Sequence, residues 1–164
     1  MKRISECIGK ELVWKPRHFF SNSYELFFDS EIIARLEVAW FRFSARAITA
    51  DGEWRFQLKG FWQRKIIIVD SRANREVGQC SVSWLGRATF VTSSAQEFFW
   101  VWRGFLGLTH AWVSGGSDIL LLRWKFSKTY VEFGQGADIS RFSALLSCLG
   151  KYLLILEQSR NNNT

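Results

Sequence analysis

Apolar and polar residues alternate along most of this chain, in short runs that are typical of β-strands. The run "EWRFQLK" (53–59) is the clearest, because every second residue from Trp54 to Leu58 is apolar and the others are polar or charged. The segment "ADG" (50–52) precedes it and predicts a hairpin with the strand "RFSARAIT" (42–49). This stretch therefore predicts two paired strands, each with one buried face.

The same plan recurs from about residue 20 to residue 133. Polar or glycine-containing segments that predict further turns occur near Asp29–Ser30, in "SRANREVG" (71–78), in "SSAQ" (93–96) and in "SGGSD" (114–118). Alternation predicts that Cys80, Val82 and Trp84 point inward, and likewise Leu122, Trp124 and Phe126. Ten to twelve short strands joined by hairpin-length turns must form a sandwich or a barrel to cover their edges.

One segment breaks the alternation. "RFSALLSCLGKYLLILEQ" (141–158) carries no turn signal, and Asp138 is a suitable N-cap for a helix from there to about Gln158. Apolar residues surround this helix almost completely, so it must be buried either in protein or in lipid. The apolar run of residues 142–156 contains Lys151 and is shorter than the roughly 20 residues that a membrane span needs. We therefore expect the helix to be buried in protein.

A barrel of about twelve strands is too wide for its own side chains to fill, and a helix fits the space inside. The sequence therefore predicts a mainly β fold: a closed antiparallel barrel of about twelve strands surrounding a hydrophobic C-terminal α-helix. We expect a single domain at 1–160, with strands at about 20–133, the central helix at about 138–158 and a disordered tail at 161–164. Lys151 would then have to reach a barrel mouth or a carboxylate.

Composition indicates the charge of the partners and the cellular compartment of the protein. The chain of 164 residues suits one domain, and its net charge of +7 favours anionic partners. A basic surface without a specific partner is the alternative. The three cysteines, Cys7, Cys80 and Cys148, are widely spaced and predict reduced thiols, hence a cytoplasmic protein. The first residues lack the apolar stretch of a secretory signal.

Candidate chemistry is sparse. The only histidines are His18 and His110, and neither lies at metal-ligand spacing from a second ligand, so both are expected at ordinary polar positions. No nucleophile elbow is present, and the glycines of "GQG" (134–136) and "SGGS" (114–117) lack the strand–loop–helix setting of nucleotide-binding motifs. We therefore expect a non-enzymatic protein without a metal or cofactor.

Four clusters interleave aromatic and basic residues: "AWFRFSAR" (39–46), "FWQRK" (61–65), "WVWR" (100–103) and "LRWKFSK" (122–128). Such mixtures bind anionic headgroups or stack nucleobases, but strand alternation with aromatic residues inside and basic residues outside explains most of the pattern. Alternation does not explain why the outward residues are so often basic. The candidate anionic-ligand surface comprises Arg123, Lys125 and Lys128 on one exposed face, with Arg64, Lys65, Arg72 and Arg75 on a separate hairpin.

The hairpin series, the unit "IIIVDSRANREVGQCSVSW" (66–84) and the closing "SALLSCLGKYLLILE" (143–157) resemble the tubby C-terminal-like superfamily, which includes tubby domains, LURP-one-related proteins and phospholipid scramblases. The resemblance implies a twelve-stranded closed barrel threaded by the C-terminal helix, and links to membrane lipids. The scramblases' cysteine-rich palmitoylation segment and acidic calcium-binding loop have no counterpart in this chain.

The predicted function is that of a binding domain, without enzymatic activity, that docks on anionic phospholipid or phosphoinositide surfaces. One alternative is a scramblase-like membrane protein whose C-terminal helix spans the bilayer. Another is a barrel that binds single-stranded nucleic acid, for which no RNP-type motif is present. We expect a monomer in the cytoplasm, peripheral to a membrane; no feature of the sequence identifies a protein partner.

Overall fold

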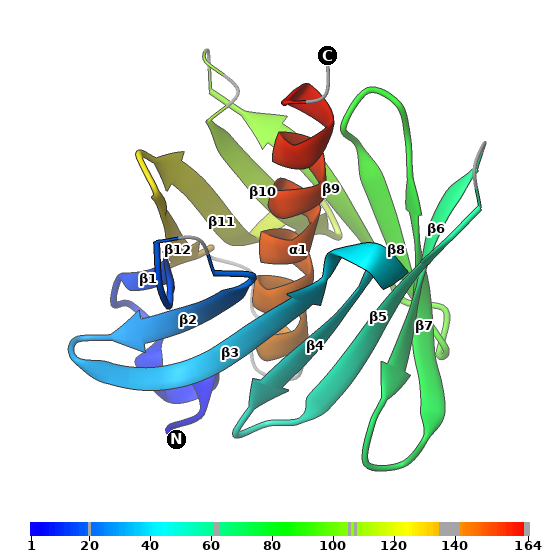
Figure 1. Ribbon diagram of the computed structural model, residues 1–164. Coiled ribbons are helices and arrows are strands. Elements are labelled where there is room, and N and C mark those ends of the chain that lie inside the picture. The colour runs from blue at the N-terminus through cyan, green and yellow to red at the C-terminus, as the bar shows by residue number, and fades with distance from the viewer. Residues whose placement is uncertain (20, 61–62, 105, 107, 135–141, 163–164) are drawn as a thin grey trace.

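A computed structural model describes residues 1–19, 21–60, 63–104, 106, 108–134 and 142–162. Within these residues, twelve strands form a closed antiparallel barrel around one C-terminal α-helix (Figure 1), which confirms the predicted fold class. Each strand pairs with its neighbours in the sequence, and β1 pairs with β12 to close the barrel. The strands are β1 Leu12–Pro16, β2 Ser23–Phe28, β3 Glu31–Ala39, β4 Ser44–Thr49, β5 Glu53–Lys59, β6 Arg64–Asp70, β7 Arg75–Val82, β8 Ala88–Thr92, β9 Glu97–Arg103, β10 Thr109–Ser114, β11 Ser117–Lys125 and β12 Lys128–Phe133.

The first strand begins earlier than the predicted limit of about residue 20. In β1, Leu12 and Trp14 are fully buried and complete the inner wall between β12 and β2. A short 3-10 helix, η1 (Ile4–Cys7), precedes β1, and the backbone N–H of Ile4 donates a hydrogen bond to the Asp51 carboxylate.

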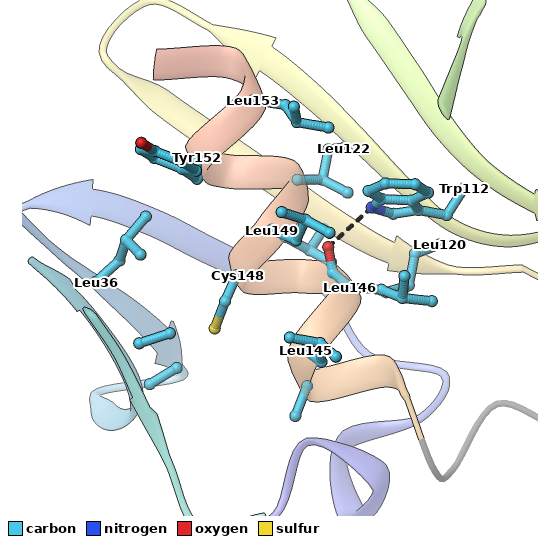
Figure 2. Packing of buried hydrophobic residues seen from close by; sticks show 14 of the residues in the cluster. Leu36, Trp112, Leu120, Leu122, Leu145, Leu146, Cys148, Leu149, Tyr152 and Leu153 are labelled. Atoms are coloured by element: carbon cyan, nitrogen blue, oxygen red, sulfur yellow. Dashed lines mark hydrogen bonds between the residues drawn. The ribbon is translucent and has the colours of Figure 1, made fainter. Parts of the chain in front are cut away.

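The helix α1 (Ser143–Asn161) runs through the barrel and is buried from Ser143 to Ile155. Figure 2 shows its leucines packed against the inward side chains of β10 and β11, where the indole N–H of Trp112 donates to the Leu146 carbonyl at 2.8 Å. The indole N–H of Trp14 donates to the Ser147 hydroxyl on the other side of the barrel. The helix thus fills the core and also satisfies the polar atoms of the large inward side chains.

Glycine at position 150 allows this fit. A Cβ atom there would lie 2.9 Å from the Trp100 ring and 3.0 Å from the Trp112 indole nitrogen. Those distances are shorter than ordinary carbon contacts, so the helix can approach the tryptophans only without a side chain at this position.

The helix extends beyond its predicted C-terminal boundary, and its predicted N-cap lies where the structure gives no description. Asp138, the predicted N-cap, lies outside the described residues. The other end was predicted at Gln158, but α1 continues to Asn161, so the first residue of the predicted disordered tail is helical. Among the described residues, no helix is both long enough and apolar enough to cross a membrane.

Within the described residues, no ion pair joins Lys151 to a carboxylate, which was one of the two sequence-based expectations for this residue. Its ammonium group donates a hydrogen bond to the Thr129 hydroxyl at 3.0 Å and lies 4.7 Å from the centre of the Tyr24 ring. A hydroxyl and an aromatic face therefore replace the expected carboxylate, and burial lowers the pKa of Lys151 to about 8.

Three residues predicted to point inward are exposed instead. Leu122 and Cys80 are fully buried as predicted, but Trp84, Trp124 and Phe126 expose 65%, 37% and 84% of their surface. Each of the three lies at or beyond the last residues of its strand, past the region where the inner wall packs against α1. Alternation therefore stops predicting burial where the strand passes the helix core.

Candidate functional site

The barrel has two ends of different construction. The turn end is formed by the short connections at 29–30, 50–52, 71–74, 93–96 and 115–116, and α1 begins beside it (Figure 1). The loop end is formed by the β1–β2, β3–β4, β5–β6, β7–β8, β9–β10 and β11–β12 connections, and α1 finishes there, where the guanidinium of Arg160 donates to the Trp84 carbonyl at 3.1 Å. All five turns predicted from the sequence are present, and all five lie at the turn end.

Exposed apolar side chains gather at the loop end. Ten of the thirteen large apolar residues that are exposed in the described part of the chain lie in its connections or in the adjoining strand ends. We call these ten residues the apolar rim: Phe19, Phe41, Phe43, Trp84, Leu85, Trp102, Leu106, Leu108, Trp124 and Phe126. A cluster of this kind on a protein surface marks a site of interaction with a partner or a membrane.

The backbone holds two of these aromatic residues in an unfavourable conformation. Phe43 follows the short 3-10 helix η2 (Trp40–Arg42) with φ of 45°, and Phe126 forms the β11–β12 turn with φ of 57°. Bulky residues are uncommon in this left-handed region, where glycine or asparagine is more stable. Residues held in sparsely populated conformations cluster at functional sites, so this strain points to a role for the exposed rings.

Four of the predicted basic residues lie beside the rim: Arg64, Lys65, Lys125 and Lys128. Lys125 pairs directly with Lys128 across the β11–β12 ladder, and Lys59, which was not among the predicted residues, pairs in the same way with Lys65. Like charges directly opposite each other are destabilising. Within the described residues, no ion pair joins a carboxylate to any of the lysines Lys59, Lys65, Lys125 and Lys128. Their charge remains available to an anionic partner.

The structure separates the other three predicted residues from this cluster. The guanidinium of Arg123 lies 3.4 Å from the Glu132 carboxylate, 3.7 Å from the Glu11 carboxylate and over the Tyr130 ring, so its charge is already balanced. Arg72 and Arg75 lie at the turn end, at the opposite end of the β6–β7 hairpin from Arg64 and Lys65. The seven predicted residues therefore do not form one surface.

Sequence reasoning missed several basic residues that belong to the loop end, among them Lys59, Arg87 and Arg160. Arg160 and Arg64 flank Trp84: the first donates to its carbonyl, and the guanidinium of the second lies 6.0 Å from its ring centre. The sequence does contain a signal of a basic end, because none of the six connections at this end contains Asp or Glu. In a meander, every second connection lies at the same end of the barrel. Grouping alternate connections would therefore have placed these basic residues at one end.

A cavity of about 200 Å³ opens at the loop end between β10, β11 and the last turns of α1. His110, predicted to be an ordinary polar residue, lies in its wall at 3% exposure and 3.5 Å from a carboxylate oxygen of Glu157. Burial lowers the pKa of His110 to about 4, so its ring is neutral at pH 7. A second pocket, which shares Glu157 with the first and is also lined by Arg64, Arg160 and Ser83, has a volume of only about 30 Å³, the space of a water molecule.

Few of the described side chains are placed to bind a metal ion or to act as nucleophiles. Within the ranges that the structure describes, no group of three or more His, Cys, Asp or Glu side chains lies close enough to hold a metal ion. The three cysteines are buried and unpaired, and burial raises the pKa of the Cys80 and Cys148 thiols. Such thiols are poor nucleophiles, because the thiolate is the reactive form.

Comparison of the chain with models of known protein families, with curated proteins and with solved structures finds no match. The resemblance to the tubby-like superfamily therefore stays a prediction.

Proposed function

We propose that this protein docks on anionic phospholipid membranes with its loop end facing the bilayer. It acts as a peripheral, non-enzymatic binding domain and works as a monomer in the cytoplasm. The observation that carries the proposal is the concentration of ten exposed apolar side chains beside lysines without carboxylate partners at one end of the barrel.

Two physical contributions support docking in this orientation. Apolar side chains gain about 25 cal/mol for each Å² that leaves water, and tryptophan favours the boundary between headgroups and acyl chains. Each basic residue close to an anionic leaflet adds about 1 kcal/mol, a contribution that salt weakens. The rim supplies the first contribution, and Lys59, Lys65, Lys125 and Lys128 supply the second.

Single-stranded nucleic acid is the competing partner, since aromatic and basic residues also bind stacked bases. Two observations favour the membrane. The rim includes the aliphatic residues Leu85, Leu106 and Leu108, which offer no stacking surface for bases. Its residues also project from separate connections around the end of α1, whereas a single strand needs a continuous groove.

The barrel and its central helix are the architecture that the tubby-like resemblance implied, which supports a link to lipids without identifying the family. A scramblase-like mechanism based on a spanning helix has no support here, because α1 is enclosed by the barrel wall from Ser143 to Ile155. Phosphoinositides, with their high charge, belong to the same class of anionic surface and form a natural second lipid to test.

Co-sedimentation with vesicles tests the proposal. We expect the protein to pellet with phosphatidylserine-containing or phosphoinositide-containing vesicles at low salt, and to bind pure phosphatidylcholine vesicles much more weakly. The triple variant Lys65→Gln, Lys125→Gln, Lys128→Gln should lose roughly 100-fold in affinity, at about 1 kcal/mol for each charge.

The matched control is Arg72→Gln with Arg75→Gln, which removes charge at the turn end and should change affinity little. Equal losses for the two sets would show that only net charge matters and would contradict the proposed orientation. Tight, salt-dependent binding of an oligonucleotide by a protein that ignores all vesicles would establish the competing reading instead.

A further inference from the structure

The cavity at the loop end has the composition of a ligand site. Its apolar walls are Leu108 on the β9–β10 connection, Trp124 on β11 and Leu154 on α1. Its polar groups are His110 on β10, with Glu157, Gln158 and Asn161 on the last turns of α1. A volume of about 200 Å³ is sufficient for a small headgroup, and the other pocket beside the helix is too small for one.

His110 is a buried polar residue with unmet hydrogen-bonding capacity. It is 3% exposed, and neither ring nitrogen has a hydrogen-bond partner in the described part of the chain. The ring is fixed in place, since it stacks on Trp100 with centres 4.9 Å apart and meets the edge of Trp102. Buried polar atoms nearly always have partners, so an unmet, rigidly held imidazole in a cavity wall indicates a missing one.

Charge decides which ligand fits. The carboxylate of Glu157 lies 3.5 Å from the His110 ring, and that ring is neutral because burial lowers the pKa of His110 to about 4. The imidazole therefore does not balance the carboxylate at neutral pH. Arg160 opposes the increase in the pKa of Glu157 that burial causes. An anion would be repelled by Glu157, and an apolar ligand would leave His110 unsatisfied.

The geometry points to a site for a primary ammonium group, of the kind carried by ethanolamine and serine headgroups, in the cavity between His110, Glu157 and Trp124. The ammonium donates hydrogen bonds to the Glu157 carboxylate and to an imidazole nitrogen of His110, and the Trp124 ring supplies an aromatic face for the cation.

The assignment of a lipid as the source of this group rests on the proposed membrane docking, but the recognition of an ammonium group does not. Water-soluble probes separate the two. O-phosphoethanolamine carries a primary ammonium group, and phosphocholine is the matched probe in which methyl groups replace the N–H donors. Neither probe needs a membrane in order to bind.

Titration of the folded protein with each probe, followed by tryptophan fluorescence and by the NMR signals of the His110 ring, tests the site. We expect O-phosphoethanolamine to bind at least 10-fold more tightly than phosphocholine and to shift the His110 signals. Glu157→Gln should weaken binding at least 10-fold, and His110→Phe several-fold. Glu37→Gln, which removes an exposed carboxylate from β3, should have no effect.

Glu157→Gln conserves size, and its thermal unfolding should match that of the unsubstituted protein, which separates loss of the site from loss of the fold. Equal affinity for the two probes, no binding at millimolar concentration, or unchanged binding in Glu157→Gln would overturn the site. Vesicle docking would be unaffected by any of these results.

Vesicles then identify the source of the ammonium group. With anionic lipid held constant, replacing phosphatidylcholine by phosphatidylethanolamine should increase vesicle affinity of the unsubstituted protein and leave that of Glu157→Gln unchanged. If the soluble probe binds but this replacement has no effect, a free amine is the ligand and the lipid source is overturned.

Discussion

The two ends of the barrel carry out the same task with different residues. At the turn end, connections of two to four residues reverse the chain with polar groups that stabilise them. The Thr49 hydroxyl accepts hydrogen bonds from the backbone N–H groups of Asp51 and Gly52, and the Asp70 carboxylate accepts them from Arg72 and Ala73. At the loop end, three of the six connections have five or six residues, and the connections lack acidic residues and carry most of the apolar rim. The need to reverse the chain explains why polar residues occupy the turn end, but it does not explain why apolar residues occupy the loop end.

Backbone conformation sharpens the contrast. At the turn end, left-handed positions are occupied by Asp29 and Asn74, together with two glycines and Ala95. Aspartate, asparagine and glycine are the residues that tolerate this conformation best. At the loop end, Phe43 and Phe126 occupy it, together with Gly60, Gly86 and Gly104. The contrast in backbone conformation therefore rests on the two phenylalanines, which hold bulky rings in an unfavourable conformation at the loop end.

The largest expected effect comes from making the loop end resemble the turn end. Replacing Phe41, Leu85, Leu106 and Phe126 together by serine should lower affinity for anionic vesicles by about 100-fold or more, because each buried apolar side chain contributes on the order of 1 kcal/mol or more. The midpoint of thermal unfolding should stay constant or rise, since these side chains are exposed. Co-sedimentation and thermal unfolding measure the two effects.

Ile8 provides the control for this substitution, because it is 50% exposed near the turn end. Ile8→Ser should leave vesicle affinity unchanged. A comparable loss in both proteins would mean that apolar surface acts without regard to position, and the contrast between the ends would have no functional content.

Substitutions at the turn end should lower stability and leave vesicle affinity unchanged. Thr49→Val and Asp70→Ala each remove a side-chain acceptor that serves two backbone N–H groups. Each should lower the free energy of unfolding by about 1–2 kcal/mol in urea denaturation. Vesicle affinity of the folded variants should equal that of the unsubstituted protein, and a fall in affinity at constant fold would assign a binding role to the turn end.

Acid should weaken the protein through the loop end. The pKa of His110 falls from its ordinary value of 6.5 to about 4 on folding, so the unfolded chain binds the proton more readily. The stability that comes from keeping this ring neutral is present above pH 6.5 and is lost as the pH falls towards 4, at up to about 1.4 kcal/mol per pH unit. Comparing unfolding of the unsubstituted protein with that of His110→Phe between these pH values isolates the contribution. Parallel pH profiles would show that His110 titrates normally.

A smaller effect is expected at Phe126, where one substitution should relieve backbone strain and also weaken vesicle binding. Phe126→Asn replaces a left-handed phenylalanine by a residue that tolerates the conformation, and should raise the free energy of unfolding by about 0.5–1 kcal/mol. The same substitution should weaken vesicle binding several-fold, because it removes one exposed ring. Chemical denaturation and co-sedimentation give the two values, and a variant that gains stability without losing affinity would remove Phe126 from the binding surface.

The sequence predicted the part of the fold that follows simple physical rules. Alternation with polar turn signals predicted the barrel and every connection of the turn end, and an apolar helix without alternation predicted the filled interior. The loop end was missed because its connections are apolar and continue the strand pattern. Trp124 and Phe126 were therefore assigned to the interior, although the helix core does not extend that far.

The candidate site was predicted only in part, for a related reason. The aromatic and basic clusters were visible, but which of them meet depends on how strands are paired and at which end each connection lies. Arg72 and Arg75 share a hairpin with Arg64 and Lys65 and still lie at the opposite end of the barrel. The role of His110 depended on its burial against Trp100 and Glu157, contacts between residues distant in the sequence.

The most direct test of the account compares the two ends in one experiment. The three native cysteines are buried, so an environment-sensitive fluorophore can be attached selectively to Leu85→Cys at the loop end or to Ser94→Cys at the turn end. On addition of phosphatidylserine-containing vesicles, we expect a blue shift with increased intensity at position 85 and no change at position 94. An equal response at both positions, or a response only at position 94, would contradict the proposal that the loop end faces the membrane.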